Sequence, residues 1–158
     1  MDLREYLHKL DERGELVRIS RPVSTQYEMA AILRQLEPKR VLFENMAESD
    51  FRVMGNLFCS KTQFGDYFGI GPADLITTLT RAVGHPSDPV QIATTPQGEA
   101  QPAPCQEVVH LEPDLRALPI PVHFPGDGGP FITAGVVITS HPVHGQNMDF
   151  HRFMQYAP

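Results

Sequence analysis

Tryptophan is absent from this 158-residue sequence, which also has only two cysteines. No stretch approaches the roughly 20 apolar residues that a membrane-spanning helix needs, so no membrane span is expected. Cys59 and Cys105 form no CxxC pair, which argues against a zinc knuckle or a redox dithiol. Outside such motifs a cysteine is more often a buried small apolar residue than a nucleophile, and both are expected to be buried. Few cysteines and a charged start without a targeting segment predict a cytoplasmic location.

Positive charge is also scarce, with 13 Lys and Arg against 19 Asp and Glu and a net charge of -6. The basic residues are scattered, and no basic run is longer than Lys39-Arg40. Nucleic acids and anionic membrane surfaces attract basic patches, so neither is expected as a partner. Apolar residues make up 41% of the chain, which is enough for one domain or for one domain and part of a second.

Hydrophobic periodicity predicts a mixed order of helices and strands in the first half of the chain. The predicted helices cover 3–13, 26–37, 61–68 and 74–83, and the predicted strands cover 15–21, 41–44 and 52–55. Asp2 can cap the first helix, and Thr25 followed by Glu28 fits a capping box for the second. This order of elements favours an α/β or α+β domain over a helix bundle or a β-sandwich.

Proline and glycine mark the second half of the chain. The window 86–104 is rich in proline and predicts a linker or a long covering loop. After it the sequence predicts a short strand at 107–111, a helical turn at 114–118, a glycine-rich loop at 124–131, and a hairpin with strands at 132–139 and 147–155. Because an isolated hairpin is marginally stable in water, further strands are expected beside it.

The densest group of chemically active side chains lies on the second hairpin strand. Alternate side chains of a strand share a face, which puts Asn147, Asp149 and His151 on one side and Met148, Phe150 and Arg152 on the other. An amide, a carboxylate and an imidazole can hold a hard cation or a phosphate-bound metal, and an arginine fork suits a carboxylate. On spacing alone, the polar face of a half-exposed edge strand is the commoner explanation.

Two further motifs have simpler structural interpretations. Glycines in the 124–131 loop could let the backbone approach a ligand or an anion, but the loop lacks the Walker A and GxGxxG patterns and is expected to be a structural turn. His141 and His144 lie in a Pro/Gly turn without an acidic partner nearby in sequence. They are therefore expected to form an exposed turn rather than a zinc pair.

Several phrases of the sequence match one known family. They are Leu-Pro-Ile-Pro at 118–121, Phe-Pro-Gly-Asp-Gly-Gly-Pro-Phe and its continuation at 124–137, and Asn147 followed by Arg152, together with weaker phrases at 2–7, 14–19, 42–45 and 55–58. With these phrases the sequence resembles the UbiD family of reversible decarboxylases. The likeness runs through most of the chain, and the glycine-rich loop followed at the right distance by Asn147 and Arg152 is its most specific part.

The resemblance implies a small mixed N-terminal α/β domain followed by the first strands of a split β-barrel flavin-binding domain. It divides the chain at 1–112, with the proline-rich linker near 86–104, and 113–158, the beginning of a truncated barrel. The implied cofactor is prenylated FMN, supplied by a UbiX-type flavin prenyltransferase. A divalent metal, expected to be Mn2+, accompanies it, with K+ as a further candidate. The implied substrate is an aromatic or α,β-unsaturated carboxylic acid, and the full-length protein is expected to be a homo-oligomer.

The resemblance also implies roles for individual residues. Arg152 matches the catalytic arginine, and Asn147 matches the asparagine that helps hold the metal at the flavin phosphate. Thr133 matches a position that lines the substrate pocket. The residues expected to bind the cofactor are Asn147, Asp149, Phe150, His151 and Arg152.

The rest of the family's active site, which includes two catalytic glutamates and the other metal ligands, follows the Asn–Arg segment in sequence. We therefore expect this chain to be the N-terminal part of a decarboxylase and to be inactive alone. Two alternatives remain open from the residues. One is a non-catalytic subunit or interaction module of a multi-subunit carboxylase, and the other is an ordinary FMN-binding split-barrel protein.

Overall fold

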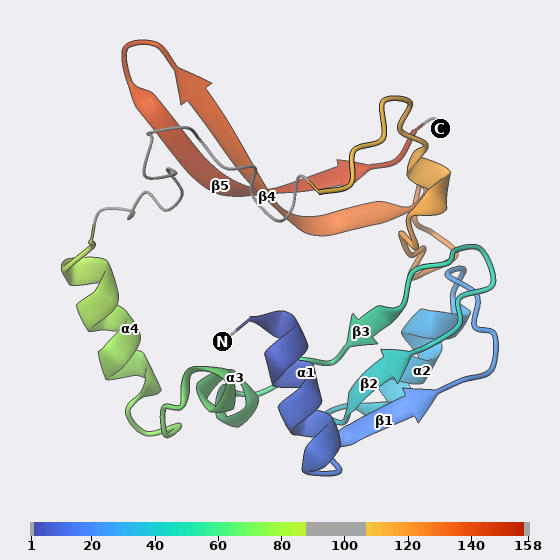
Figure 1. Ribbon diagram of the computed structural model, residues 1–158, viewed down its shortest axis with the longest axis horizontal. Coiled ribbons are helices and arrows are strands. Elements are labelled where there is room, and N and C mark those ends of the chain that lie inside the picture. Colours follow the sequence, from blue (N-terminus) through green and yellow to red (C-terminus); the bar gives the residue numbers. More distant parts are fainter. Residues whose placement is uncertain (1, 88–106, 157–158) are drawn as a thin grey trace.

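The computed structural model describes residues 2–87 and 107–156 (Figure 1). The elements follow in the order α1 (Leu3–Glu12), β1 (Leu16–Ile19), α2 (Glu28–Leu36), β2 (Arg40–Phe43), β3 (Val53–Gly55), α3 (Lys61–Phe68), α4 (Leu75–Gly84), a 3-10 helix (Leu115–Ala117), β4 (Phe131–His141) and β5 (Gly145–Met154). This mixture confirms the predicted fold class. The proline-rich linker predicted at 86–104 lies almost wholly outside the described residues. None of the described helices is long and apolar enough to cross a membrane.

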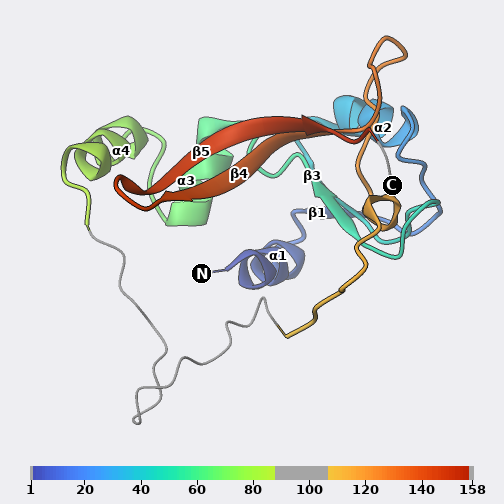
Figure 2. The same cartoon turned by 90° about the horizontal axis from the view of Figure 1, so that it is seen from above.

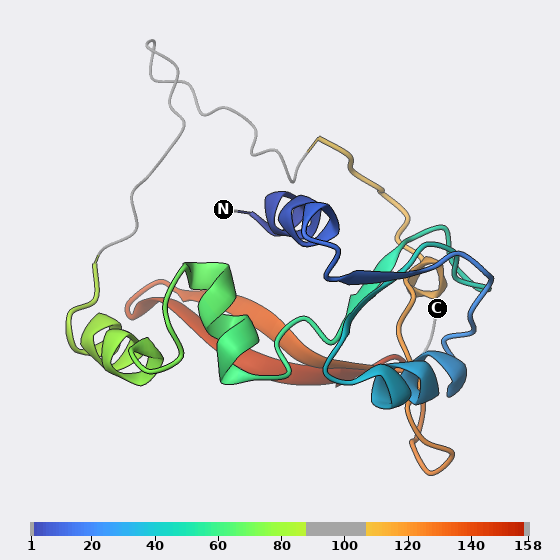
Figure 3. The same cartoon turned by 90° about the horizontal axis from the view of Figure 1, so that it is seen from below.

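The first half of the chain forms a three-stranded sheet in which β2 is central, parallel to β1 and antiparallel to β3. Helices α1 and α2 lie on opposite sides of this sheet (Figures 2 and 3). The α2 side holds the main core, a cluster of fully or almost fully buried side chains: Val23, Met29, Val41, Phe43 and Met46. Every residue of β2 is buried, as the apolar run at 41–44 predicts.

Helix α1 begins as its sequence predicts, with a capping box in which the Asp2 carboxylate accepts from the Glu5 N–H and Glu5 reaches back to the Asp2 N–H. The capping box predicted at Thr25 is wrong. Helix α2 starts three residues later, and Tyr27 precedes it with a left-handed φ of 64° and without a side-chain cap. The backbone of Thr25 and Tyr27 instead pairs with Val122, so a tertiary contact decides where this helix begins.

The strand predicted at 107–111 is also wrong. These residues form bends, and the β-prone pair Val108 and Val109 is exposed. Among the described residues no strand lies beside this segment, so its backbone groups have no ladder to join. The helical turn predicted next is confirmed as the 3-10 helix, in which the Asp114 carboxylate accepts a hydrogen bond from the Arg116 N–H.

The predicted hairpin is confirmed by the antiparallel pairing of β4 and β5, the long ribbon at the top of Figure 1. It joins the first half of the chain through residues 121–122. The Phe131 N–H donates to the Pro121 carbonyl, and Val122 exchanges two backbone hydrogen bonds with the segment before α2. The pairing register shifts between Ile132 and Gly135, which marks a β-bulge in β4.

Candidate functional site

Strand β5 presents the predicted polar face as expected. Residues Asn147, Asp149 and His151 pair in register with Thr139, Val137 and Gly135 of β4. The His151 Nε2 and Asp149 Oδ2 atoms lie 3.1 Å apart, which places both side chains on the same side of the strand. All ten residues of β5 are exposed, so this polar face is open to solvent in the described chain.

Arg152 lies on the opposite side of β5 from Asn147, because the two positions differ by an odd number of residues along a strand. Its neighbours His151 and Phe153 pair with Gly135 and Ile132. Arg152 therefore lies opposite the bulge of β4, which contains Thr133. The structure thus brings the predicted catalytic residue and the predicted pocket residue to the same place along the hairpin.

A cavity of about 460 Å3 lies at this bulge and is lined by Thr133, its neighbours in β4 and the Leu118–Pro121 segment. Two phrases of the family resemblance therefore meet around one cavity of a size typical of small-molecule sites. Most of the lining side chains are apolar, including Leu118, Ile120 and Ile132. Such a wall suits the hydrocarbon part of an organic acid, while the charged end requires a group such as Arg152 close by.

The glycine-rich loop is a closed turn, as its structural interpretation predicts. The Asp127 carboxylate accepts hydrogen bonds from the His123 and Phe124 N–H groups at 3.1 and 3.0 Å. A Cβ atom at Gly128 would lie 3.3 Å from the Met154 sulfur, so a glycine here lets the loop pack tightly against the end of β5. The loop therefore helps to fix the strand that carries the candidate site.

The two histidines of the hairpin turn behave as predicted. Their rings stack at 4.7 Å, and the His141 Nδ1 atom accepts from the Val143 and His144 N–H groups. Both side chains are exposed. Within residues 2–87 and 107–156, no three His, Cys, Asp or Glu side chains are grouped so that they could hold a metal ion.

The prediction that both cysteines are buried is wrong for Cys59, whose side chain is exposed next to the N-terminus of α3. Partial desolvation raises the pKa of its thiol, and the negative charge of Glu37 adds to that effect. A raised pKa leaves less thiolate at neutral pH, in keeping with an unreactive thiol. Cys105 lies outside the described residues.

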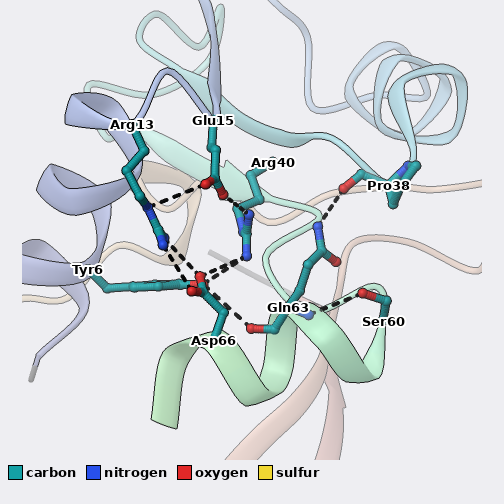
Figure 4. Close-up of polar contacts among 8 residues, drawn as sticks. All are labelled: Tyr6, Arg13, Glu15, Pro38, Arg40, Ser60, Gln63 and Asp66. Carbon is teal, nitrogen blue, oxygen red and sulfur yellow. Dashed lines mark hydrogen bonds and ion pairs between the residues drawn. The ribbon is translucent and has the colours of Figure 1, made fainter. Parts of the chain in front are cut away.

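One polar cluster was not anticipated from the sequence (Figure 4). The Asp66 carboxylate accepts from both terminal nitrogens of Arg13 and from the Tyr6 hydroxyl, at 2.7–3.0 Å. Arg40, whose side chain is 8% exposed, donates to Glu15, Tyr6 and Asp66. The Arg13 hydrogen bonds are the largest cause that lowers the pKa of Asp66 to about 2. We call Tyr6, Arg13, Glu15, Arg40 and Asp66 the polar clamp.

The polar clamp connects α1, β1, β2 and α3, and its members are separated by up to 60 residues in sequence. Burial is the main cause that raises the pKa of Tyr6, followed by its hydrogen bond to Asp66. Among its buried side-chain nitrogen and oxygen atoms in the described structure, the Arg40 Nε alone lacks a hydrogen-bond partner, which is typical of a structural junction. No local motif signals such a cluster, because its members come from separate segments of the sequence and each alone is an ordinary polar residue.

The chain thus consists of an α/β unit followed by a hairpin that carries Asn147 and Arg152, and each of these two parts matches a family model. The family model of the 3-octaprenyl-4-hydroxybenzoate carboxy-lyase N-terminal domain matches residues 7–83, and that of its Rift-related domain matches residues 97–158. Together the two models cover most of the chain. The chain belongs to the UbiD family.

Individual relatives agree with this assignment. Anhydromevalonate phosphate decarboxylase of Methanosarcina mazei is 32% identical over 98% of this chain and 33% of the relative. An evolved dimeric form of the UbiD-class enzyme HmfF from Pelotomaculum thermopropionicum, in complex with prFMN, is 31% identical with a TM-score of 0.78, over 95% of this chain and 35% of that chain. The apo 3,4-dihydroxybenzoic acid decarboxylase of Enterobacter cloacae is 26% identical with a TM-score of 0.80, over 98% of this chain and 34% of that chain.

The chain spans about a third of the length of these relatives. Decarboxylases are among the relatives and solved structures that the chain resembles. Family and structural likeness together confirm the resemblance inferred from the glycine-rich loop and the Asn147–Arg152 spacing.

Proposed function

We propose that this chain is the N-terminal part of a carboxy-lyase that reversibly decarboxylates an aromatic or α,β-unsaturated carboxylic acid with prenylated FMN. The observation that carries the proposal is the register of the hairpin, which puts Arg152 opposite the bulge that contains Thr133. Thr133 itself lines an open groove of about 460 Å3. A structural neighbour in complex with prFMN supports the choice of cofactor. The domain boundary near residue 112, the cytoplasmic location and inactivity of the chain alone are parts of the same proposal.

The geometry of β5 restricts how one ligand could use this strand. Asn147 and Arg152 lie five residues apart, or about 16 Å along a strand, and they project from opposite faces. A ligand that contacts both side chains must therefore be elongated and pass along an edge or end of the strand. A flavin mononucleotide has its phosphate and its ring at opposite ends, which suits such a pair of contacts.

Arg152 has two tasks in this proposal. Its guanidinium is always charged and presents a planar fork that can hold a carboxylate in one orientation by two hydrogen bonds. Held in this way, the carboxylate is oriented for loss of CO2, and the apolar lining beside Thr133 offers contacts to the hydrocarbon part of the substrate. The prenylated flavin, when bound, supplies the electron sink for the chemistry. The proton donor is expected to be a glutamate, and none of the residues to which this proposal gives a role is a glutamate.

Asn147 is proposed to contribute one oxygen ligand to a divalent metal at the flavin phosphate, expected to be Mn2+, with K+ as a further candidate ion. An amide oxygen suits a hard cation. The described residues fit this role only in part, because no group of three His, Cys, Asp or Glu side chains accompanies Asn147 in them. Asp149, Phe150 and His151 are proposed to contact the flavin along the same strand.

Partners follow from the same chemistry. A UbiX-type flavin prenyltransferase is proposed to supply the cofactor, and the small-molecule partner is the carboxylic acid substrate. A homo-oligomer is proposed for the full-length protein, in line with the dimeric HmfF relative.

The decisive experiment uses a polypeptide that contains this chain together with the remaining domains of the family, co-produced with a flavin prenyltransferase. Absorbance should reveal bound flavin, and CO2 release should depend on an added aromatic or unsaturated acid. We expect Arg152→Lys to retain flavin but to lower kcat about 100-fold, because its point charge cannot orient a carboxylate as the fork does. Asn147→Ala should lose cofactor affinity.

Arg116→Gln is the matched control, because Arg116 is exposed and pairs only locally with Asp114. It should leave both flavin content and turnover unchanged. A folded, flavin-loaded protein that turns over none of the acids tested would refute the proposal. An unmodified FMN spectrum with NAD(P)H oxidation would instead favour the ordinary flavin-binding alternative.

A further inference from the structure

A second groove, distant from the hairpin, lies between α1 and the face of the sheet opposite to α2. Its volume is about 550 Å3, within the range of small-molecule sites. The apolar part of its lining comes from both walls: Leu3, Leu7, Leu16, Leu42, Phe51 and Met54. By the strand register, Leu42 pairs with Met54 and with Arg18, so these side chains share the sheet face toward α1.

The rim of this groove is rich in positive charge, although the chain as a whole is negatively charged. Arg4, Arg18 and Arg52 line it, in a protein of net charge -6. Arg18 is already neutralised, since it donates to Asp11 at 2.8 Å and to Glu44 at 2.6 Å. His8 is likewise engaged with Glu12.

The other two arginines are not engaged in this way. Within the described part of the chain, neither Arg4 nor Arg52 makes a hydrogen bond or ion pair, and Arg52 acts on Glu44 only through space. Arg4 comes from α1 and Arg52 from the segment before β3, so the two free guanidinium groups belong to opposite walls of one apolar groove.

We propose that this groove binds an organic monocarboxylate with an apolar aryl or alkyl body, at a site separate from the hairpin. The leucines and Met54 would bury the body and remove its apolar surface from water. Arg4 and Arg52 would hold the carboxylate, because their planar forks match its geometry. A ligand of this class recognises both features at once, whereas a purely apolar molecule leaves both arginines without a partner.

Methionine methyl NMR of the 158-residue chain offers a direct test, because the methionines report on separate regions. With 13C-methyl labels, Met54 reports on the groove, Met29 and Met46 on the buried core, and Met148 and Met154 on the hairpin. Benzoate is the probe and benzamide its uncharged analogue. We expect the Met54 signal to shift and saturate with benzoate while the core signals stay fixed.

Two comparisons decide the result. Loss of the charge-assisted hydrogen bonds should weaken binding about tenfold or more, both for benzamide and in the Arg4→Gln/Arg52→Gln double variant. Both arginines are exposed, so the variant should keep the dispersed core signals of a folded chain. Arg116→Gln is the matched control and should bind benzoate as the unaltered chain does.

The proposal is overturned if the Met54 signal does not move, or if it moves equally with benzamide or in the double variant. Shifts confined to Met148 and Met154 would also overturn it, because they would place the benzoate on the hairpin. No flavin takes part in this titration, so its outcome is independent of the proposed decarboxylation.

Discussion

The sheet of β1–β3 and the hairpin of β4 and β5 are both built from β-prone sequence, but they are buried to opposite extents. Every residue of β2 is buried, and every residue of β5 is exposed. The apolar side chains Ile138 and Phe150 of the hairpin are 64% and 77% exposed. Alternation and a turn are thus enough to form a hairpin, whereas a core requires helices packed on the sheet, as α2 packs on β2.

Polar contacts differ in the same way between the two regions. The polar clamp ties four elements of the first half together around a buried arginine. On the hairpin, the Asp149–His151 pair joins two residues of one exposed strand. The first half therefore has tertiary contacts that hold it together, and the hairpin has mainly its own ladder. A site carried by β5 depends on further protein around the hairpin for its rigidity.

The two regions should differ most in how much the loss of a phenylalanine ring lowers the free energy of unfolding. Phe43→Ala removes a fully buried ring from the core and should lower the free energy of unfolding by about 3–5 kcal/mol. Phe150→Ala is the matched variant on the hairpin and should change it by about 0.5 kcal/mol or less, as exposed substitutions do. Urea unfolding followed by circular dichroism measures both. Equal effects of the two variants would contradict the contrast in burial.

Removal of the buried cation of the polar clamp should cause the next largest decrease in the free energy of unfolding. Arg40→Ala leaves Glu15 and Asp66 without this partner, and breaking a buried ion pair costs about 3–5 kcal/mol. Because both carboxylates are partly exposed and Arg13 remains beside them, we expect about 2–3 kcal/mol here. The same urea experiment checks it. Arg18→Ala, at an exposed arginine with two ion pairs, is the control and should have a clearly smaller effect.

Acid should weaken the polar clamp in a narrow pH range. The pKa of Asp66 is about 2 in the folded chain against 3.8 ordinarily, so the unfolded state binds its proton first as pH falls. The contribution of Asp66 to stability is therefore complete above pH 4 or so and is lost as pH falls toward 2. Partial exposure reduces it to about 1–2 kcal/mol. Unfolding at several pH values should show this loss for the unaltered chain, and the loss should be smaller for Asp66→Asn.

The elements that follow local rules were predictable from the sequence, and those that depend on tertiary contacts were not. Helix α3 has the predicted bounds because Ser60 caps it and Gly69 ends it with a left-handed φ of 67°. The start of α2 was missed because the backbone at Thr25 pairs with Val122, almost a hundred residues away. The segment at 107–111 has strand propensity but, among the described residues, no neighbouring strand.

In the candidate site, too, the features set by local rules were predictable from the sequence and those set by tertiary contacts were not. Alternation along β5 correctly placed Asn147, Asp149 and His151 on one face, because strand geometry alone determines it. The position of Arg152 opposite Thr133 depends on the bulge, which no local pattern predicted. The polar clamp and the groove beside α1 were also missed, since each combines side chains from several elements.

The smallest effect on the free energy of unfolding should come from the contact between Asp149 and His151 on the hairpin. Asp149→Asn removes the charge opposite His151, but both side chains are about half exposed, at 46% and 55%. Exposed pairs of this kind contribute about 0–1 kcal/mol, because water screens them and both side chains lose freedom in forming them. We expect a change of about 0.5 kcal/mol or less in the free energy of unfolding, measured by urea unfolding beside Arg40→Ala. A loss as large as that of the polar clamp would mean that the hairpin, too, is held by its polar contacts.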